Sequence, residues 1–232
     1  WNKKYKEAIP EFEKVKDIKG AHRSHISDAA LHVGYANARL KKYDEAIAAY
    51  KKVLDNPKTH PHHCSRAQLA IGDVKRSQKK YDEAVAEYKK VMSIPKRHLG
   101  HEADADMKIG LVLRSQKKYP ESTEALEKSI ANKKVSYYSK GLSQIYIGHN
   151  LRSQKKNEDA IKAFEKVNSF KKVHPYHKVD AERLTGYCYY DMKQYDKAKE
   201  VFEKVIADKK ASSYQKKSSK QMLDKIAKMQ KK

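Results

Sequence analysis

Residues 72–91 read GDVKRSQKKYDEAVAEYKKV, and residues 110–129 repeat the same plan as GLVLRSQKKYPESTEALEKS. The shared YDEA segment and its variants recur along the whole chain, each beginning 38 residues after the one before (43 minus 5, 81 minus 43 and so on). They begin at Tyr5, Tyr43, Tyr81, Tyr119, Asn157 and Tyr195. A fixed period of this length predicts a repeat protein, in which each unit packs against its neighbours.

Other positions keep the same phase, and their spacing indicates helices. Glycine recurs at Gly34, Gly72, Gly110, Gly148 and Gly186. In the second half of each unit a small residue, a large apolar residue and usually a valine follow at i, i+4 and i+7, which is one face of a helix. In one unit, a first helix is expected over about 102–116 and a second over about 120–132, with Lys117 and Lys118 between them. So short a turn predicts an antiparallel hairpin and an all-α fold.

The recurring glycine requires a packing reason, because glycine inside a helix costs about 1 kcal/mol relative to alanine. We expect close approach of the two helices to be that reason, with Ala84 or Ala160 of the second helix meeting the glycine of a first helix or its neighbour. Each hairpin also leaves apolar surface that only the next hairpin can cover. The pattern therefore predicts an open solenoid.

Composition limits the class of protein. The 232 residues carry 52 Lys and Arg against 29 Asp and Glu, a formal net charge of +23. The apolar stretches are far shorter than the roughly 18 residues that would indicate a membrane-spanning helix. With 16 Tyr, 4 Phe and 1 Trp, the chain has the aromatic residues of a packed core. Cys64 and Cys188 lie more than three units apart, so they are not expected to form a disulfide in an extended solenoid.

The chain resembles the tetratricopeptide repeat family in the spacing of Gly72, Tyr81, Ala84 and Tyr88, and the resemblance covers nearly all of it. It implies a right-handed superhelix of helix pairs whose first helices line a concave, ligand-binding face. Two features depart from the family: the period is 38 residues instead of the usual 34 or so, and the aromatic residue expected early in each first helix is missing. Its positions hold Ala30, Gln68, Asp106, Gln144 and Glu182. The lengthened repeats are similar to those of bacterial cell-envelope proteins, which implies a bacterial protein of the envelope or periplasm.

The period predicts one solenoid over residues 1–232. Its expected parts are a partial repeat (1–19), five full repeats (20–57, 58–95, 96–133, 134–171 and 172–209) and a basic capping helix (210–232). Trp1 has the phase of Arg39, so the first residues are expected to end a first helix that begins upstream, followed by a second helix from Tyr5 to Lys19. The cap is expected from Ser212 to Met229, because solenoid ends need a polar outer face.

Arginine is the main candidate for ligand contact on the concave face. Arg76, Arg114 and Arg152 recur in one phase, with Arg39 one residue out of phase. A guanidinium offers a rigid fork of donors that suits carboxylate or phosphate groups. Tyr35, His149 and Tyr187 share another phase of the same face. The alternative is that duplication copied the string RSQKK and that the arginine stems pack across repeats.

Histidine forms pairs at the entrance to the first helices: His22 with His25, His60 with His63, His98 with His101 and His174 with His177. One unit offers four metal donors together, namely His60, His62, His63 and Cys64. Because neighbouring helices lie about 8–10 Å apart, histidines of adjacent units are not expected to share an ion. Helix capping, packing between repeats and a pH-dependent surface are the alternatives to metal binding.

No enzyme motif or cofactor motif occurs in the sequence. The phosphate loop, dinucleotide fingerprint and nucleophile elbow are missing, and the HEADAD segment from His101 has Ala105 where a zinc protease needs histidine. The leading hypothesis is a non-enzymatic scaffold that binds a protein or peptide segment, acidic in character, on the concave face. The alternatives are a basic module for an anionic polymer or surface (nucleic acid, polysaccharide or membrane) and a metal-binding protein.

Overall fold

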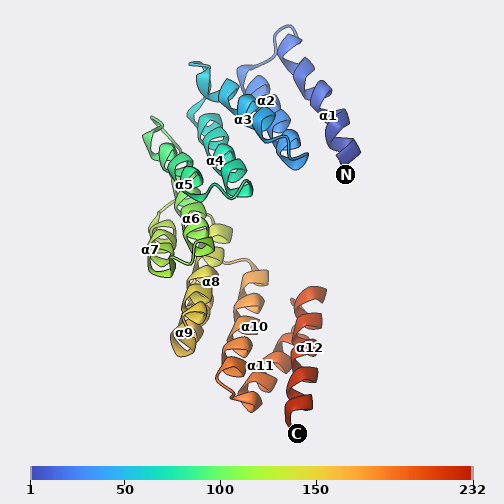
Figure 1. Ribbon diagram of the computed structural model, residues 1–232, viewed down its shortest axis with the longest axis vertical. Helices are drawn as coiled ribbons and strands as arrows, with labels where there is room; N and C mark the ends of the chain where they lie inside the picture. Colours follow the sequence, from blue (N-terminus) through green and yellow to red (C-terminus); the bar gives the residue numbers. More distant parts are fainter. Residues whose placement is uncertain (1, 231–232) are drawn as a thin grey trace. The chain divides into compact units, whose positions relative to one another are not determined.

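The computed structural model describes residues 2–230, and every regular element in that range is helical (Figure 1). The chain divides into two compact units, Trp1–Val112 and Leu113–Lys232. In each unit, helices that follow one another in the chain pack against one another. The prediction of an all-α solenoid is confirmed.

The first unit alternates two kinds of helix, which we call A for the first and B for the second member of each hairpin. Its A helices are α2 (Arg23–Arg39), α4 (Pro61–Ser77) and α6 (Leu99–Ser115), the last of which runs three residues past the unit boundary. Its B helices are α1 (Asn2–Lys14), α3 (Tyr43–Asp55) and α5 (Tyr81–Lys89). Short 3-10 turns, Val15–Asp17 and Lys90–Ser93, extend α1 and α5.

The second unit continues the alternation. Its B helices are α7 (Tyr119–Ala131), α9 (Asn157–Ser169) and α11 (Tyr195–Ala207). Its A helices are α8 (Tyr137–Ser153) and α10 (Pro175–Asp191), and the cap is α12 (Ser213–Gln230). The prediction of a C-terminal helix is confirmed, and Ile226 of this helix is buried against Phe202 and Ala198 of α11.

The two kinds of helix lie on different faces of each unit. The A helix α2 contacts α4 in the first unit, and α8 contacts α10 in the second. Within the described part of each unit, by contrast, no B helix contacts another B helix. The A helices are therefore the closely spaced, inner layer.

One expectation about the N-terminal end is wrong. The residues Asn2–Lys14 form one continuous helix, so the described residues before Tyr5 do not belong to a separate preceding helix. Trp1, on which the expectation also rested, lies outside the described residues. The first described hairpin therefore begins with α2.

The turns between A and B helices share an unusual backbone. Each contains a lysine with φ between 60° and 62°, the left-handed region, at Lys41, Lys79, Lys117, Lys155 and Lys193. At the first turn, the Lys42 N–H donates to the Asn37 carbonyl at 2.9 Å, and the Lys41 N–H donates to the Ala38 carbonyl at 3.0 Å. These bonds satisfy carbonyls at the helix end and fix the angle at which the B helix begins.

The glycines of α2, α4, α8 and α10 each meet an aromatic ring of the following B helix. A methyl group at Gly72 would lie 2.5 Å from Cδ1 of Tyr88, and one at Gly148 would lie 2.6 Å from Cδ1 of Phe164. The expectation that Ala84 or Ala160 fills this space is wrong. Both alanines are fully buried, but the longer aromatic side chain one turn further along helix B reaches the glycine instead.

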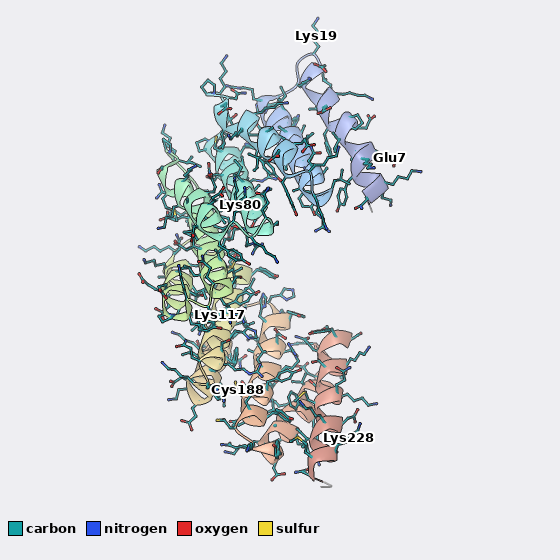
Figure 2. All side chains as sticks on the ribbon, viewed as in Figure 1. Glu7, Lys19, Lys80, Lys117, Cys188 and Lys228 are labelled. Atoms are coloured by element: carbon teal, nitrogen blue, oxygen red, sulfur yellow. The ribbon has the colours of Figure 1, made fainter. Side chains whose placement is uncertain are left out.

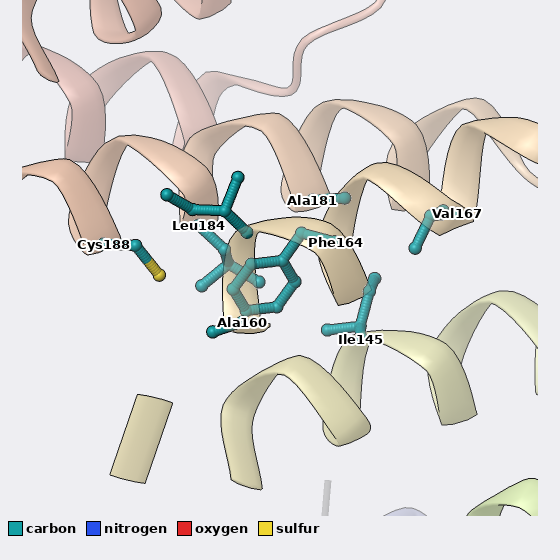
Figure 3. Packing of buried hydrophobic residues seen from close by; sticks show 8 residues of the cluster. Ile145, Ala160, Phe164, Val167, Ala181, Leu184 and Cys188 are labelled. Atoms are coloured by element: carbon teal, nitrogen blue, oxygen red, sulfur yellow. The ribbon is translucent and has the colours of Figure 1, made fainter. Parts of the chain in front are cut away.

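Phe164 shows how this contact builds the core of the second unit. Its ring lies among Ile145 of α8 and Leu184 and Cys188 of α10 (Figure 3). One ring therefore joins three consecutive helices. Burial of a phenylalanine side chain of this kind contributes about 2–3 kcal/mol.

Substituting Gly148 with alanine tests this packing. Helix propensity alone would favour Gly148→Ala by about 1 kcal/mol, but the added methyl would overlap the Phe164 ring. We expect a net loss of about 1–3 kcal/mol in the free energy of unfolding, measured by urea denaturation.

The same substitution in a Phe164→Leu background is the control, because the smaller side chain removes the overlap. There, Gly148→Ala should cost less than it does in the wild-type chain. Equal costs in the two backgrounds would contradict the proposed contact.

Candidate functional site

The surface formed by neighbouring A helices contains the predicted ligand-binding residues, and we call it the helix-A face. In the first unit it is formed by α2 and α4, and in the second by α8 and α10. Lysine side chains extend outward in both units, for example at Lys80, Lys117 and Lys228 (Figure 2). The chain that carries the helix-A face is therefore strongly basic, with a net charge of +23.

A shallow hollow of about 280 Å³ opens on this face between α2 and α4. It is lined by Leu31, His32, Tyr35, Tyr50, Arg66 and Ala70. Tyr35 is 51% exposed, and its ring packs edge-on against Tyr5 of α1 with the ring centroids 6.0 Å apart. The Arg39 guanidinium lies 6.0 Å from the centroid of the same Tyr5 ring. The structure thus brings the predicted Tyr35 and Arg39 together around a third residue, Tyr5.

Arg76 lies beside a charge network that the sequence analysis missed. Asp73 accepts a hydrogen bond from the Tyr88 hydroxyl at 2.8 Å and from Lys108 Nζ at 2.7 and 2.9 Å, and Arg76 Nη2 lies 3.5 Å from it. Burial and the nearby Asp73 carboxylate raise the pKa of Tyr88, so the phenol stays protonated. Asp73 therefore links α4, α5 and α6. The only signal in the sequence was that an acidic residue holds the repeat position occupied in the other units by Tyr35, Leu111, His149 and Tyr187.

The arginines of the second unit reach the next A helix. The Arg114 guanidinium lies 5.7 Å from the Tyr146 ring centroid, and that of Arg152 lies 5.2 Å from the Tyr187 ring centroid. Arg152 Nε also donates to Asp191 at 2.7 Å. These contacts are the packing across repeats that the alternative interpretation describes. The Arg152 side chain is still 28% exposed.

His149 belongs to the apolar part of the face. Its ring lies 5.9 Å from Tyr146 and 5.8 Å from Phe164, measured between centroids. Burial, followed by repulsion from Arg114, lowers the pKa of His149 to about 4. The residue is therefore neutral at physiological pH and does not add to the positive charge.

The four predicted metal donors have separate partners. His60 caps α4, where its Nδ1 accepts from the His62 N–H at 3.2 Å. His63 Nε2 lies 3.4 Å from Asp28, and Cys64 Sγ faces the Thr59 carbonyl at 4.0 Å. Within residues 2–230, no group of three or more His, Cys, Asp or Glu side chains is placed to hold a metal ion.

Two histidines of adjacent repeats contact each other directly. His62 Nδ1 of α4 and His101 Nε2 of α6 are 2.9 Å apart, a hydrogen-bond distance. The spacing of helix axes alone does not predict this contact, because the two side chains extend toward each other from two helices. Burial is the main cause that lowers the pKa of both rings, which favours the neutral pair.

These features define a class of protein: a solenoid of helical hairpins in a strongly basic chain. Two family models of the tetratricopeptide repeat match the chain, one over residues 25–97 and one over residues 180–208. The chain therefore contains tetratricopeptide repeats over these residues, and a repeat of this kind supports protein–protein interaction. A search of curated protein sequences finds no match.

Solved structures show the same fold. The apo form of RapI aligns with a TM-score of 0.73 at 14% identity, over 99% of this chain and 70% of RapI. Kinesin light chain TPR-like repeats from Podospora anserina align with a TM-score of 0.59 at 17% identity, over 78% of this chain and 93% of theirs. YrrB, described as a TPR protein with an unusual peptide-binding site, aligns with a TM-score of 0.53 at 18% identity, over 83% and 91%. Such identities show the fold alone.

None of the helices described is both long enough and apolar enough to cross a membrane.

The depressed pKa of His149 predicts a loss of stability in acid. Below pH 6.5 an unfolded chain binds a proton at this residue, whereas the folded chain does so only near pH 4. Stability should therefore fall as the pH drops from about 6.5 to about 4, and this contribution should level off below pH 4. We expect His149→Gln to remove about 2–3 kcal/mol of the difference between pH 7 and pH 4, measured by urea denaturation.

The His149→Gln variant keeps all the other titratable residues of the wild-type chain. The difference between the two profiles of stability against pH therefore reports on His149. Parallel profiles for the wild-type chain and His149→Gln would contradict the burial of a neutral His149.

Proposed function

We propose that the helix-A face binds an acidic protein segment, with Tyr35 as an apolar anchor and Arg39 as a partner for a carboxylate. The observation that carries this proposal is the half-exposed Tyr35 ring beside a hollow and next to an available cation. An aromatic side chain in that position buries a large area with little loss of conformational entropy, which is typical of binding hot spots.

The charge near Tyr35 supports an acidic ligand. Arg39 is exposed and has no ion pair with any residue in 2–230, whereas Arg66 at the other side of the hollow pairs with Asp28 at 2.6 Å. An unpaired guanidinium can form a bidentate contact with a ligand carboxylate without breaking an existing ion pair. The net charge of +23 would also speed the approach of an acidic partner.

The second unit offers a second set of contacts of the same kind. Arg152 stacks on Tyr187 and keeps part of its side chain exposed, and neutral His149 lies in the same phase as Tyr187. A segment bound there would meet cation and aromatic side chains in alternation. YrrB, which shares the fold, is described as having a peptide-binding site, and this supports peptide binding as a function that such a solenoid can carry.

The competing function is binding to an anionic polymer through the basic C-terminal helix. Its support is a row of exposed lysines on α12, namely Lys217, Lys220, Lys225 and Lys228. Deleting the helix would not test this function cleanly, because Ile226 of α12 covers the core around Phe202. Replacing the four lysines with glutamine keeps the helix and removes the charge.

The test uses a peptide selected on the wild-type chain from a random 12-residue display library, with its affinity measured by fluorescence anisotropy. We expect the selected peptides to be acidic, and Tyr35→Ala combined with Arg39→Ala to weaken binding by at least about tenfold, since hot-spot residues cost roughly 2 kcal/mol or more.

The matched control combines Tyr137→Ala with Lys51→Ala, which removes an equally exposed tyrosine and one cation from outside the hollow. This control should bind the peptide as the wild type does. Equal losses in the two double variants, or loss only in the glutamine variant of α12, would contradict the proposal and favour the anionic-polymer function.

A further inference from the structure

A cavity of about 960 Å³ lies in the first unit, at the N-terminal ends of α2 and α4 and beside the loop that precedes α6. This location is distinct from the hollow around Tyr35, which lies further along the helices. Four basic residues line the cavity: Arg23, Lys58, Lys96 and Arg97. None of the residues that line it is Asp or Glu.

Three histidines that line the cavity cap helices in the same way. The Nδ1 atoms of His22, His60 and His98 accept the N–H of the residue two positions on, at 3.2, 3.2 and 3.1 Å. A ring nitrogen that accepts a hydrogen bond carries no proton, so the neutral ring carries its proton on Nε2. Each histidine thus has an N–H donor on the ring edge opposite its helix. None of the three Nε2 atoms has a hydrogen-bond partner within residues 2–230.

A buried histidine also lines the cavity. His63 is only 7% exposed, and its Nδ1 has no hydrogen-bond partner among the described residues. The hydroxyl of Thr59, another lining residue, is likewise buried and unpaired there. Buried polar atoms in folded proteins are nearly always paired with protein, water or ligand, so these two point to a ligand in the cavity.

The fixed charges of the cavity are only partly compensated. Arg97 pairs with Glu102 at 3.1 Å, while Arg23, Lys58 and Lys96 form no ion pair with the residues described. The N-termini of α2 and α4 add positive potential from the helix dipoles. Cations, neutral N–H donors and helix N-termini all favour the same kind of ligand, which is an anion.

We propose that this cavity binds a compound that carries several phosphate groups. The three capping histidines belong to three successive A helices, whose axes in packed helices lie about 8–10 Å apart. A single small anion cannot reach all of them, whereas a chain or ring of linked phosphates can. Phosphate oxygens also accept several hydrogen bonds each, which matches the many donors and the lack of carboxylates in the lining.

The test is isothermal titration calorimetry of the full chain with tripolyphosphate. The informative variant is His22→Ser combined with His60→Ser, because serine keeps a helix cap but removes the imidazole N–H. We expect it to weaken tripolyphosphate binding by at least about tenfold, as lost charge-assisted hydrogen bonds do. Thermal unfolding followed by circular dichroism should change little.

His174→Ser is the matched control, because His174 caps α10 through the same Nδ1 contact but lies outside the cavity. It should leave tripolyphosphate binding unchanged. Unchanged binding in His22→Ser with His60→Ser would overturn the proposal, and so would an equal loss in His174→Ser.

A second pair of variants separates the cavity from diffuse surface charge. Lys58→Gln with Arg23→Gln should weaken tripolyphosphate binding at least about tenfold, while Lys162→Gln with Lys199→Gln, at exposed positions of the second unit, should not. Citrate should bind at least about tenfold more weakly than tripolyphosphate. Equal losses in the two double variants would overturn the assignment of binding to this cavity. Citrate binding as tight as that of tripolyphosphate would overturn the assignment to a phosphate-bearing ligand.

Discussion

The contact between a helix-A glycine and the aromatic ring of the following helix B is the constraint on which the other features depend. Because the ring occupies the space where a side chain would stand, the two helices pack closely and in one register. The ring of Phe164 also reaches the next A helix, so one side chain sets the position of three helices. The cost of glycine in a helix is offset by this burial.

This register decides which residues become the surface of each A helix. With Gly34 turned toward Tyr50, Tyr35 lies at the exposed edge of α2 and His22 caps its N-terminus. A helices therefore carry two different kinds of surface. Their sides form the helix-A face, and their N-terminal ends, with the preceding loops, form a basic cavity in the first unit. A solenoid can change either surface without disturbing the buried contact, because the surface positions occupy different phases of the repeat.

The fold was predictable because a period of 38 residues appears in the sequence itself, with turns and buried positions in fixed phases. What the sequence could not provide were contacts that depend on side-chain reach. Ala160 was expected to be the residue that packs close to a glycine such as Gly148, but the longer side chain of Phe164 reaches that glycine. The contact between His62 and His101 of neighbouring repeats, 2.9 Å apart, was likewise not predicted from the spacing of helix axes. Lys79 has a left-handed backbone that usually favours glycine, so its residue type gave no signal.

We propose that the A helices, and not the B helices, form the binding face. Amide hydrogen exchange of the full chain, with and without the peptide selected from the random library, tests this claim directly. We expect slower exchange in α2 and α4 or in α8 and α10 when the peptide is bound, with little change in α3, α5, α9 and α11. Protection concentrated in those B helices would contradict it.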